Sequence, residues 1–474
     1  MRARVVTAVA TPLVVLTGYV ALDIADVVPG FLTAQGEWVA PAPFVTAAPI
    51  EVLTPDATTG LGEDTPLPAA PVVQGYAQAL RDDSRTGTST NVSVVDLLTG
   101  ETLADLDAAD PQVPASTTKV LTTVAAVAQM GPDATFTTSV TWDGTTLTLV
   151  GGGDALLTDG YGHGGSLDAT EEQIHEFGGV HPARGWAGLA DLADAVVAAL
   201  PTGAPVDTLA LDDTLISGPL YPVEFPSYAL QLGYAGRVAA IAIDEGRETD
   251  DVYSQRSTDP ALDAAETFVT LLEERGISVG HVTRAAASGT TIASVESAPL
   301  SVISQYVSRD SDNTIAETLA RLTSVARGGA GTAEAGAAAI TNTLTEIGID
   351  TAGLQLYDGA GFSTKNQISP RTLVSTLRTA ALDPSLSSIL DELAIVGVSG
   401  TTTSRAASPD VVGRALAKTG SLTGVTSMAG LAETADGRWL VYATLLDGMP
   451  YGQADPRAAI DEFVAALAGC GCEG

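Results

Sequence analysis

Residues 116–131 of this chain read "STTKVLTTVAAVAQMG", and they are the most informative segment for its architecture. It begins with a serine, ends on a glycine and is apolar on almost every face, so it predicts a buried helix with a Ser cap and a Gly stop. Ser116 and Lys119 are three positions apart and therefore share one face of that helix. The lysine amine can then reach the serine hydroxyl at a helix N-terminus, where free backbone N–H groups stabilise a developing oxyanion.

Two further short motifs follow along the chain, "SDN" at residues 311–313 and "KTG" at residues 418–420. The first interrupts a helical pattern, and the second lies in a segment that reads as strands and turns. Taken singly, such strings arise by chance, and Ser116 could be a simple helix cap. In this order, with a helix, a loop and a strand as carriers, they favour one shared site.

The use of lysine supports that interpretation. Of 22 basic residues only three are lysines (Lys119, Lys365 and Lys418), and two of these lie in the motifs. Asn313 is likewise one of only four asparagines, so the scarce residues gather in the motifs. Arginine stays charged in proteins, whereas a buried lysine can lose its proton and act as a base.

A serine hydroxyl is a poor nucleophile and needs an adjacent base. Lys119 can serve as that base if burial and the neighbouring Lys418 both lower its pKa, because each disfavours the ammonium form. The motifs therefore predict a serine nucleophile, Ser116, activated by a lysine.

The ordered triple resembles the motif set of penicillin-binding proteins and class A β-lactamases. Ser311 follows Ser116 by 195 residues, and Lys418 follows Ser311 by 107. Class A β-lactamases have a much shorter first interval, so a segment is inserted here before "SDN". In this the chain is similar to the D-alanyl-D-alanine carboxypeptidase/endopeptidase family, the type C low-molecular-mass penicillin-binding proteins (peptidase family S13).

Other stretches carry the same resemblance, over about residues 76–470. They are "LVGGGDALLT" at 149–158, where Ala155 replaces the family's usual Pro, "DSDNTIAETLAR" at 310–321, "YDGAGFSTKN" at 357–366, "VGVSGTTTSR" at 396–405 and "KTGSLTGV" at 418–425. The family pattern implies structural roles for Asp358 and Gly361. The insertion is shorter than in better-known members, so one added subdomain is expected.

The resemblance implies an α/β (α+β) fold: a serine β-lactamase/transpeptidase-like domain, an antiparallel sheet flanked by helices, with an inserted subdomain. It implies a serine-type D-alanyl-D-alanine carboxypeptidase that acts on peptidoglycan stem peptides through an acyl-enzyme and also binds β-lactams. The balance with endopeptidase activity stays open. The implied roles are Ser116 as nucleophile, Lys119 as base, Ser311 as proton relay to the leaving amine, Asn313 as partner of the substrate amide, Lys418, Thr419 and Gly420 at the terminal carboxylate, and the backbone N–H groups of Ser116 and Ser421 as oxyanion hole.

Two alternatives remain, a β-lactamase and an inactive penicillin-binding scaffold. Class A β-lactamases use a Glu in an E-x-x-x-N segment, and no Glu of this chain has Asn four positions on. The scaffold is disfavoured because no motif residue is missing. No cofactor or metal is expected, since the four histidines form no H-x-x-x-H pair, although His163 and His181 could line a loop-bordered site.

The N-terminus predicts export. After "MRAR", residues 5–22 form an apolar run of 18 residues, long enough for an uncleaved membrane anchor, with a cleaved signal peptide as the alternative. We predict a signal segment at 1–35, a Pro-rich stalk at 36–75, a catalytic domain at 76–134 and 291–474, and an inserted subdomain at 135–290. The body is thus expected outside the cytoplasm, anchored to the membrane or secreted to the wall.

The charge excludes one class of partner. A net charge of −35 repels phosphate backbones, so no nucleic acid is expected to bind. Cys470 and Cys472 in the tail form either a bridge or two inert thiols.

Overall fold

The computed structural model describes residues 65–165, 181–449 and 455–471. These residues belong to one compact unit. The predicted signal segment and most of the predicted stalk lie outside them. Across the described ranges, no helix combines the length and apolar character needed to span a bilayer.

The first element of the fold is a six-stranded sheet in which every neighbouring pair is antiparallel. β12 and β13 are buried along nearly their whole length, as expected for strands covered on both faces. The strand order is β10 (Ala394–Ile395), β11 (Ala415–Leu422), β12 (Val425–Glu433), β13 (Trp439–Asp447), β1 (Ser89–Asp96) and β2 (Thr102–Leu106).

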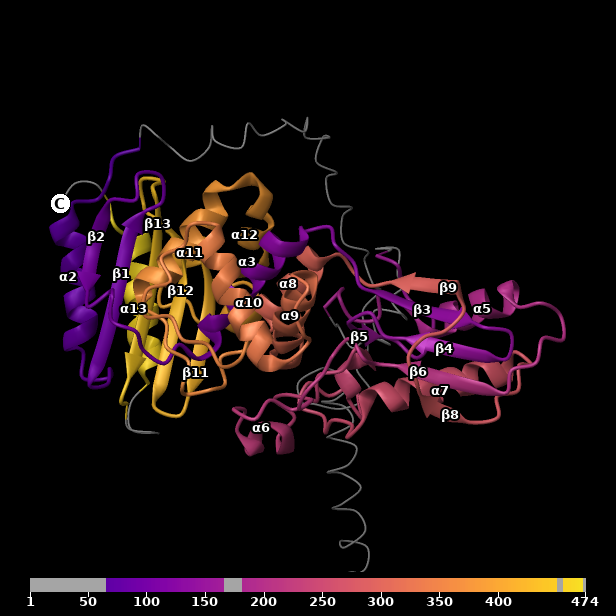
Figure 1. Ribbon diagram of the computed structural model, residues 1–474. Coiled ribbons are helices and arrows are strands. Elements are labelled where there is room, and N and C mark those ends of the chain that lie inside the picture. The colour runs from indigo at the N-terminus through magenta and orange to yellow at the C-terminus, as the bar shows by residue number, and fades with distance from the viewer. Residues whose placement is uncertain (1–64, 166–180, 450–454, 472–474) are drawn as a thin grey trace, which may run out of the picture. The chain divides into compact units, whose positions relative to one another are not determined.

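Helices cover both faces of this sheet (Figure 1). One face packs on α2 (Ala70–Asp82) and α13 (Pro456–Ala468). The other face carries the larger helical layer, which contains α3 (Thr118–Met130), α8 (Leu300–Arg309), α9 (Asn313–Ala326), α10 (Ala333–Glu346), α11 (Pro370–Leu382) and α12 (Ser388–Glu392). The predicted fold class, an antiparallel sheet flanked by helices, is confirmed.

The start of α2 corrects the predicted end of the stalk. The helix begins at Ala70, inside the segment 36–75 that the prolines led us to expect as extended. Pro71 occupies the first turn, where its missing N–H has no helical partner to lose. Val73 and Ala77 are fully buried against the sheet, and this burial holds the turn in place.

A second, five-stranded sheet has four of its strands within the predicted insertion, while its edge strand β9 continues past residue 290. The strand order is β8 (Val282–Arg284), β6 (Thr208–Asp212), β4 (Thr146–Val150), β3 (Thr137–Trp142) and β9 (Thr290–Glu296). β3 and β4 pair antiparallel, whereas β4, β6 and β8 run parallel. With α5 (Leu189–Ala199) and α7 (Pro260–Glu274) the sheet encloses its own apolar core. We call residues 135–290 the inserted segment; its boundaries as a domain stay a prediction.

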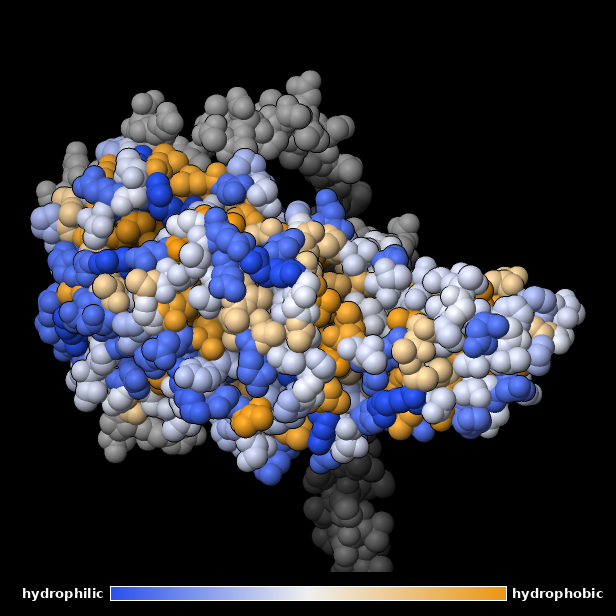
Figure 2. Space-filling view, in the orientation of Figure 1, coloured by the Kyte–Doolittle hydropathy of each residue, from blue (hydrophilic) through white to orange (hydrophobic). Residues whose placement is uncertain are grey.

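The remaining elements are short. The inserted segment also contains β5 (Asp154–Leu157), which pairs with β7 (Ile241–Ile243), and α6 (Ser227–Gln231). Figure 2 shows apolar surface where Figure 1 places α6, and Val223, Tyr228 and Leu232 are exposed there. Short 3₁₀ turns lie at η1 (Ala115–Thr117), η2 (Asp244–Gly246), η3 (Pro384–Leu386), η4 (Gly400–Thr402) and η5 (Pro409–Val411).

In the C-terminal tail, Cys470 is a buried free thiol. Cys472, the other half of the predicted pair, lies outside the described residues.

Candidate active site

Ser116 lies in a 3₁₀ turn rather than at a helix cap. η1 (Ala115–Thr117) precedes α3, whose first residue is Thr118. Ala115 adopts a left-handed backbone with φ +50°, which is rare for a residue with a Cβ and marks local strain. The hydroxyl of Thr118 donates to the Ala115 carbonyl at 2.9 Å. The sharp turn leaves Ser116 partly exposed while the helix behind it is buried, as predicted.

Lys119 is fully buried beneath Ser116. Its Nζ lies 3.0 Å from Ser116 Oγ, 2.7 Å from Asn313 Oδ1 and 2.6 Å from the Ala360 carbonyl oxygen. All three contacts are neutral acceptors, so none compensates the charge of an ammonium. Burial lowers the pKa of Lys119 to about 7, against the smaller opposing effects of Asp312 and Asp358. A neutral amine at this position can accept the proton of the Ser116 hydroxyl.

Lys418 forms a second, parallel pair with Ser311. From β11 its Nζ donates to Ser311 Oγ at 2.8 Å and to the Thr419 carbonyl at 2.9 Å. Burial, and then the charge of Lys119, lowers the pKa of Lys418 well below its usual value. The sequence predicted that Lys418 lowers the pKa of Lys119, but burial is what lowers it, and the charge acts in the other direction, from Lys119 on Lys418.

Gly420 brings β11 against the nucleophile. A Cβ added at this position would lie 2.9 Å from the Ser116 nitrogen and 2.8 Å from the Pro114 oxygen, so only glycine fits. Thr419 is partly exposed, and its hydroxyl lies 2.8 Å from that of Thr401. Ser421, the next residue, is exposed and pairs with Thr426 of β12. The KTG part of β11 thus lies along the exposed side of the Ser116 turn.

Asp358 explains how a backbone carbonyl comes to face Lys119. Its buried carboxylate accepts the N–H groups of Ala360 (2.8 Å), Phe362 (3.3 Å) and Ser363 (2.7 Å), and that of Gly361 as well. The resulting tight loop directs the Ala360 carbonyl oxygen at Lys119. The family pattern implied structural roles for Asp358 and Gly361, but it gave no sign of the Ala360 contact, because any residue can supply a backbone carbonyl.

A cavity of about 350 Å³ opens beside these residues. Ser311, Asn313 and Thr401 line it, and each of them contacts one of the motif residues described above. Residues of the inserted segment form the opposite wall, among them Tyr234 and Tyr253, whose rings pack edge to face at 5.2 Å. The pocket therefore offers space for a bound group beside the Ser311–Asn313 loop.

His181 also lines this cavity, as the sequence allowed. Its ring lies 5.4 Å from that of Tyr306, and burial lowers the pKa of the imidazole to about 4. It is therefore neutral at physiological pH and too weak a base to replace Lys119. His163 contacts Trp186 away from this cavity. Within the described ranges, no three His, Cys, Asp or Glu side chains gather as a metal site would require.

The predicted site residues thus come together in one place. Ser116 contacts Lys119, Lys119 contacts Asn313, and Lys418 contacts Ser311. The contact between Lys119 and Asn313 was not predicted: the amide oxygen faces the lysine, and the amide nitrogen donates to the Tyr234 carbonyl at 2.8 Å.

Comparison with known proteins gives the same answer. The model of the D-Ala-D-Ala carboxypeptidase 3 (S13) family matches residues 73–256 and 248–469. Carboxypeptidase DacB of Mycolicibacterium smegmatis is 34% identical over 391 residues, which cover 80% of each chain. A D-alanyl-D-alanine carboxypeptidase of an Actinomadura species is 28% identical over 455 residues, covering 82% of this chain and 83% of the relative.

A solved structure shares the fold. Penicillin binding protein 4 of Haemophilus influenzae superposes with a TM-score of 0.68 at 21% identity, covering 83% of this chain and 98% of that one. The resemblance drawn from the motifs is confirmed: the chain belongs to the D-Ala-D-Ala carboxypeptidase 3 (S13) family, whose members are serine hydrolases with a penicillin-binding fold.

Proposed function

We propose that Ser116 is the nucleophile with which this carboxypeptidase cleaves the terminal D-alanyl-D-alanine bond of peptidoglycan stem peptides. One observation carries the assignment: the Nζ of Lys119, fully buried and with its pKa lowered to about 7, lies 3.0 Å from Ser116 Oγ. At neutral pH a large fraction of this amine is unprotonated and ready to act as a base.

In the proposed acylation, Ser116 Oγ attacks the carbonyl carbon of the penultimate D-alanine, and its proton passes to Lys119 Nζ. The backbone N–H groups of Ser116 and Ser421 stabilise the oxyanion. The C–N bond then breaks, and the leaving amine takes the proton that Lys119 received, relayed through the Ser311 hydroxyl, so that Lys119 is neutral again; Lys418 contacts that hydroxyl. D-alanine leaves, and the stem peptide stays bound to Ser116 as an ester.

The remaining motif residues hold the substrate. Lys418 and Thr419 bind the terminal carboxylate, with Gly420 giving it access, and Asn313 bonds the amide of the acyl part. A carboxylate beside Lys418 favours its ammonium form, and that charge in turn favours neutral Lys119. Water finally hydrolyses the ester, with Lys119 returning as base.

A β-lactam would follow the same route up to the ester. The lactam C–N bond breaks, but the amine remains tethered to the acyl group and continues to block the site. Intact-mass measurement after incubation with benzylpenicillin should therefore show one stable adduct on the wild type and none on Ser116→Ala. Release of D-alanine from a stem-peptide substrate should disappear in the same variant.

Three results would change this proposal. An adduct that persists in Ser116→Ala would place the nucleophile elsewhere. Rapid drug hydrolysis without a lasting adduct would indicate the β-lactamase alternative, and no reaction at all would indicate the inactive scaffold. Assaying cross-linked dimers beside single stem peptides would reveal how far endopeptidase activity accompanies carboxypeptidase activity.

We also propose that the enzyme works outside the cytoplasm, held by residues 5–22 or released after their cleavage. The support is the basic start, the apolar run and a substrate that belongs to the cell wall. Mass measurement of the N-terminal peptide from membrane and medium fractions tests it. An intact N-terminus recovered only from the cytosol would overturn the proposal.

A further inference from the structure

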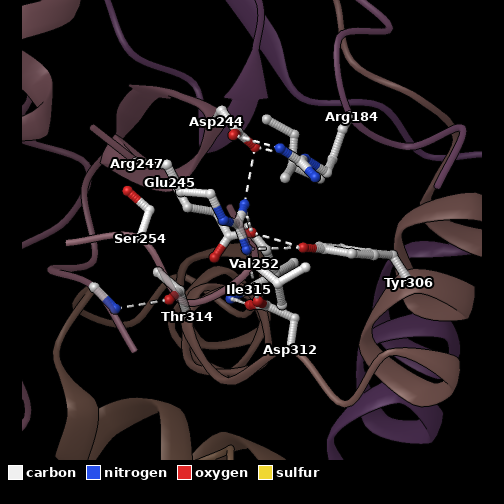
Figure 3. A network of polar contacts seen from close by, with 12 residues as sticks. Arg184, Asp244, Glu245, Arg247, Val252, Ser254, Tyr306, Asp312, Thr314 and Ile315 are labelled. Atoms are coloured by element: carbon white, nitrogen blue, oxygen red, sulfur yellow. Dashed lines mark hydrogen bonds and ion pairs between the residues drawn. The ribbon is translucent and has the colours of Figure 1, made fainter. Parts of the chain in front are cut away.

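The Ser311–Asn313 loop has a second polar neighbourhood, in which Arg247, Tyr306 and Asp312 line the same cavity as Ser311 and Asn313. Here Asp244, Glu245 and Arg247 of the inserted segment meet Tyr306 of α8 and Asp312 of the loop (Figure 3). Of these residues only Asp312, the middle residue of SDN, belongs to the motifs. Glu245, Arg247 and Asp312 are all at least nine-tenths buried.

Arg247 is the centre of this cluster. Its Nη1 lies 2.9 Å from Asp244 Oδ1 and 2.7 Å from Glu245 Oε1, while its Nη2 donates to the Tyr306 hydroxyl at 3.1 Å and lies 3.6 Å from Asp312 Oδ2. Tyr306 in turn donates to Glu245 at 2.9 Å. The planar guanidinium thus joins the inserted segment, α8 and the loop through one rigid group.

The cluster is held firmly from its own side. Arg184 binds the carboxylate of Asp244 with two hydrogen bonds, and Arg256 lies 3.3 Å from Glu245. Burial alone would raise the pKa of Glu245, but the charges of Arg247 and Arg256 lower it to about 2. Glu245 therefore stays ionised and keeps Arg247 in place.

The inserted segment and the Ser311–Asn313 loop, which meet in this cluster, both contain residues with strained backbones. Asp244 and Glu245 adopt left-handed conformations with φ of 42° and 57°, and so does Ser311, with φ 60°. A non-glycine residue in this conformation is strained and persists only where its surroundings hold it there. Strain on both sides of one buried ion cluster indicates that the cluster fixes the loop conformation.

Asp312 links this cluster to the reacting groups. Its Oδ1 accepts the Ile315 N–H at 2.8 Å and caps α9, while its Oδ2 faces Arg247. Its two neighbours in the loop are Ser311, which contacts Lys418, and Asn313, which contacts Lys119. A shift of Asp312 would therefore move both contacts at once.

We propose that Arg247, oriented by Glu245 and Tyr306, is a positioning residue for catalysis: the inserted segment uses it to clamp Asp312 and so to align Ser311 and Asn313 with the two lysines. The inference rests on the proposed role of Ser116 as nucleophile. It assigns the inserted segment a part in the chemistry without contact to the reacting atoms.

The test separates positioning from folding. We would measure the rate constant of acylation at saturating β-lactam and the affinity of the preceding complex, both per folded molecule, for the full chain. Arg247→Gln should lower the rate constant about tenfold to a hundredfold, the usual effect of a small misplacement of catalytic groups, and change the affinity far less. Arg247→Lys, which keeps the charge but not the planar fork, should recover part of the loss.

Arg438→Gln is the matched control. Arg438 forms an equally buried ion pair with Asp96, 2.5 Å between Nε and Oδ1, and neither residue belongs to the active site. This variant should lose thermal stability but acylate at the wild-type rate. A destabilised Arg247→Gln that still acylates at the wild-type rate would reduce the cluster to a structural role and overturn the proposal.

A double-mutant cycle sharpens the assignment. Asp312→Asn keeps the oxygen that caps α9 but replaces the one that faces Arg247 with an NH₂ group. Its effect and that of Arg247→Gln should therefore overlap, and the double variant should resemble the worse single one. If the two substitutions lowered the rate constant by factors that multiply in the double variant, the proposed clamp would be contradicted. If Arg247→Gln does not fold, Tyr306→Phe tests the same point by removing one hydroxyl, and an unchanged rate constant there would also overturn the proposal. A wild type that forms no adduct would instead overturn the proposed function, and the clamp with it.

Discussion

The cations on the two sides of the Ser311–Asn313 loop have different kinds of partner, neutral on one side and acidic on the other. On one side, Lys119 and Lys418 contact only hydroxyl, amide and carbonyl oxygens. On the other, Arg247 contacts carboxylates. Both sides are buried, yet burial lowers the pKa of each lysine, while the arginines keep Glu245 ionised.

The difference shows that lysine and arginine have different tasks around this loop. A base must be able to lose its proton, so it is buried among neutral acceptors. A clamp must not lose its charge, so it is an arginine matched with carboxylates. The scarcity of lysine in the sequence follows this division: two of the three lysines are buried in the site, and the third, Lys365, lies on the surface.

The largest loss of activity is expected from Lys119→Arg, which places a permanent positive charge at the position of the proposed base. Arginine cannot be deprotonated, so acylation should fall by about 10²–10⁴-fold, the usual contribution of a general base. The rate of adduct formation with benzylpenicillin measures it, beside melting curves that report whether the variant folds.

Lys365→Arg is the control for this change, because Lys365 is exposed and pairs with Glu224 at 2.9 Å. It should acylate like the wild type. An active Lys119→Arg would exclude Lys119 as the base.

The acylation rate should also depend on pH with a defined sign. Lys119 must be unprotonated, and its pKa is about 7, so the rate should rise with pH through about 7 and fall about tenfold per unit below it. Lys418 must be protonated to hold the carboxylate, and its lowered pKa places an alkaline limb below the usual lysine range. Stopped-flow acylation across pH measures both limbs. A rate that is flat across neutral pH would contradict a lysine base.

The motifs of the site could be predicted from the sequence because they contain residues that are rare in this chain and lie in segments with a clear helix or strand pattern. Lys119 lies on a helix at i+3 from Ser116, and Lys418 lies on a strand. Arg247 gave no such signal, since arginine is the common cation of this chain and Glu245 is one of 57 acidic residues. The left-handed turns at Ala115 and Ser311 were equally hidden, because neither residue type favours that conformation.

The fold shows the same limit. The apolar pattern and the Gly stop predicted the buried helix at residues 116–131, although the structure begins α3 at Thr118. The parallel pairing of β4 with β6 was not predicted: Thr146 pairs with Thr208, and periodicity identifies strands but not partners so far apart.

Asp358→Asn would perturb the lysine side more gently. The amide keeps one oxygen but faces backbone N–H groups with its own NH₂, so we expect a loss of about 1–3 kcal/mol of folding free energy from unpaired donors. Asp358 also opposes the fall in the pKa of Lys119, so its loss should lower that pKa and move the acid limb to lower pH. Melting curves and the acylation pH profile test the two effects. A limb that moved to higher pH would contradict the sign of this interaction.

The smallest expected effect concerns the carboxylate end of the site. Thr401→Val removes the hydroxyl that lies 2.8 Å from that of Thr419, without touching either lysine. One hydrogen bond is worth about 1 kcal/mol net, so the affinity of the pre-acylation complex should fall about fivefold while the rate constant of acylation stays unchanged. Thr403→Val is the control, because its exposed hydroxyl bonds only the Gly400 carbonyl within its own turn. A change in the rate constant rather than in affinity would mean that Thr419 takes part in proton transfer, and the division between the lysines that react and the groups that bind would have to be redrawn.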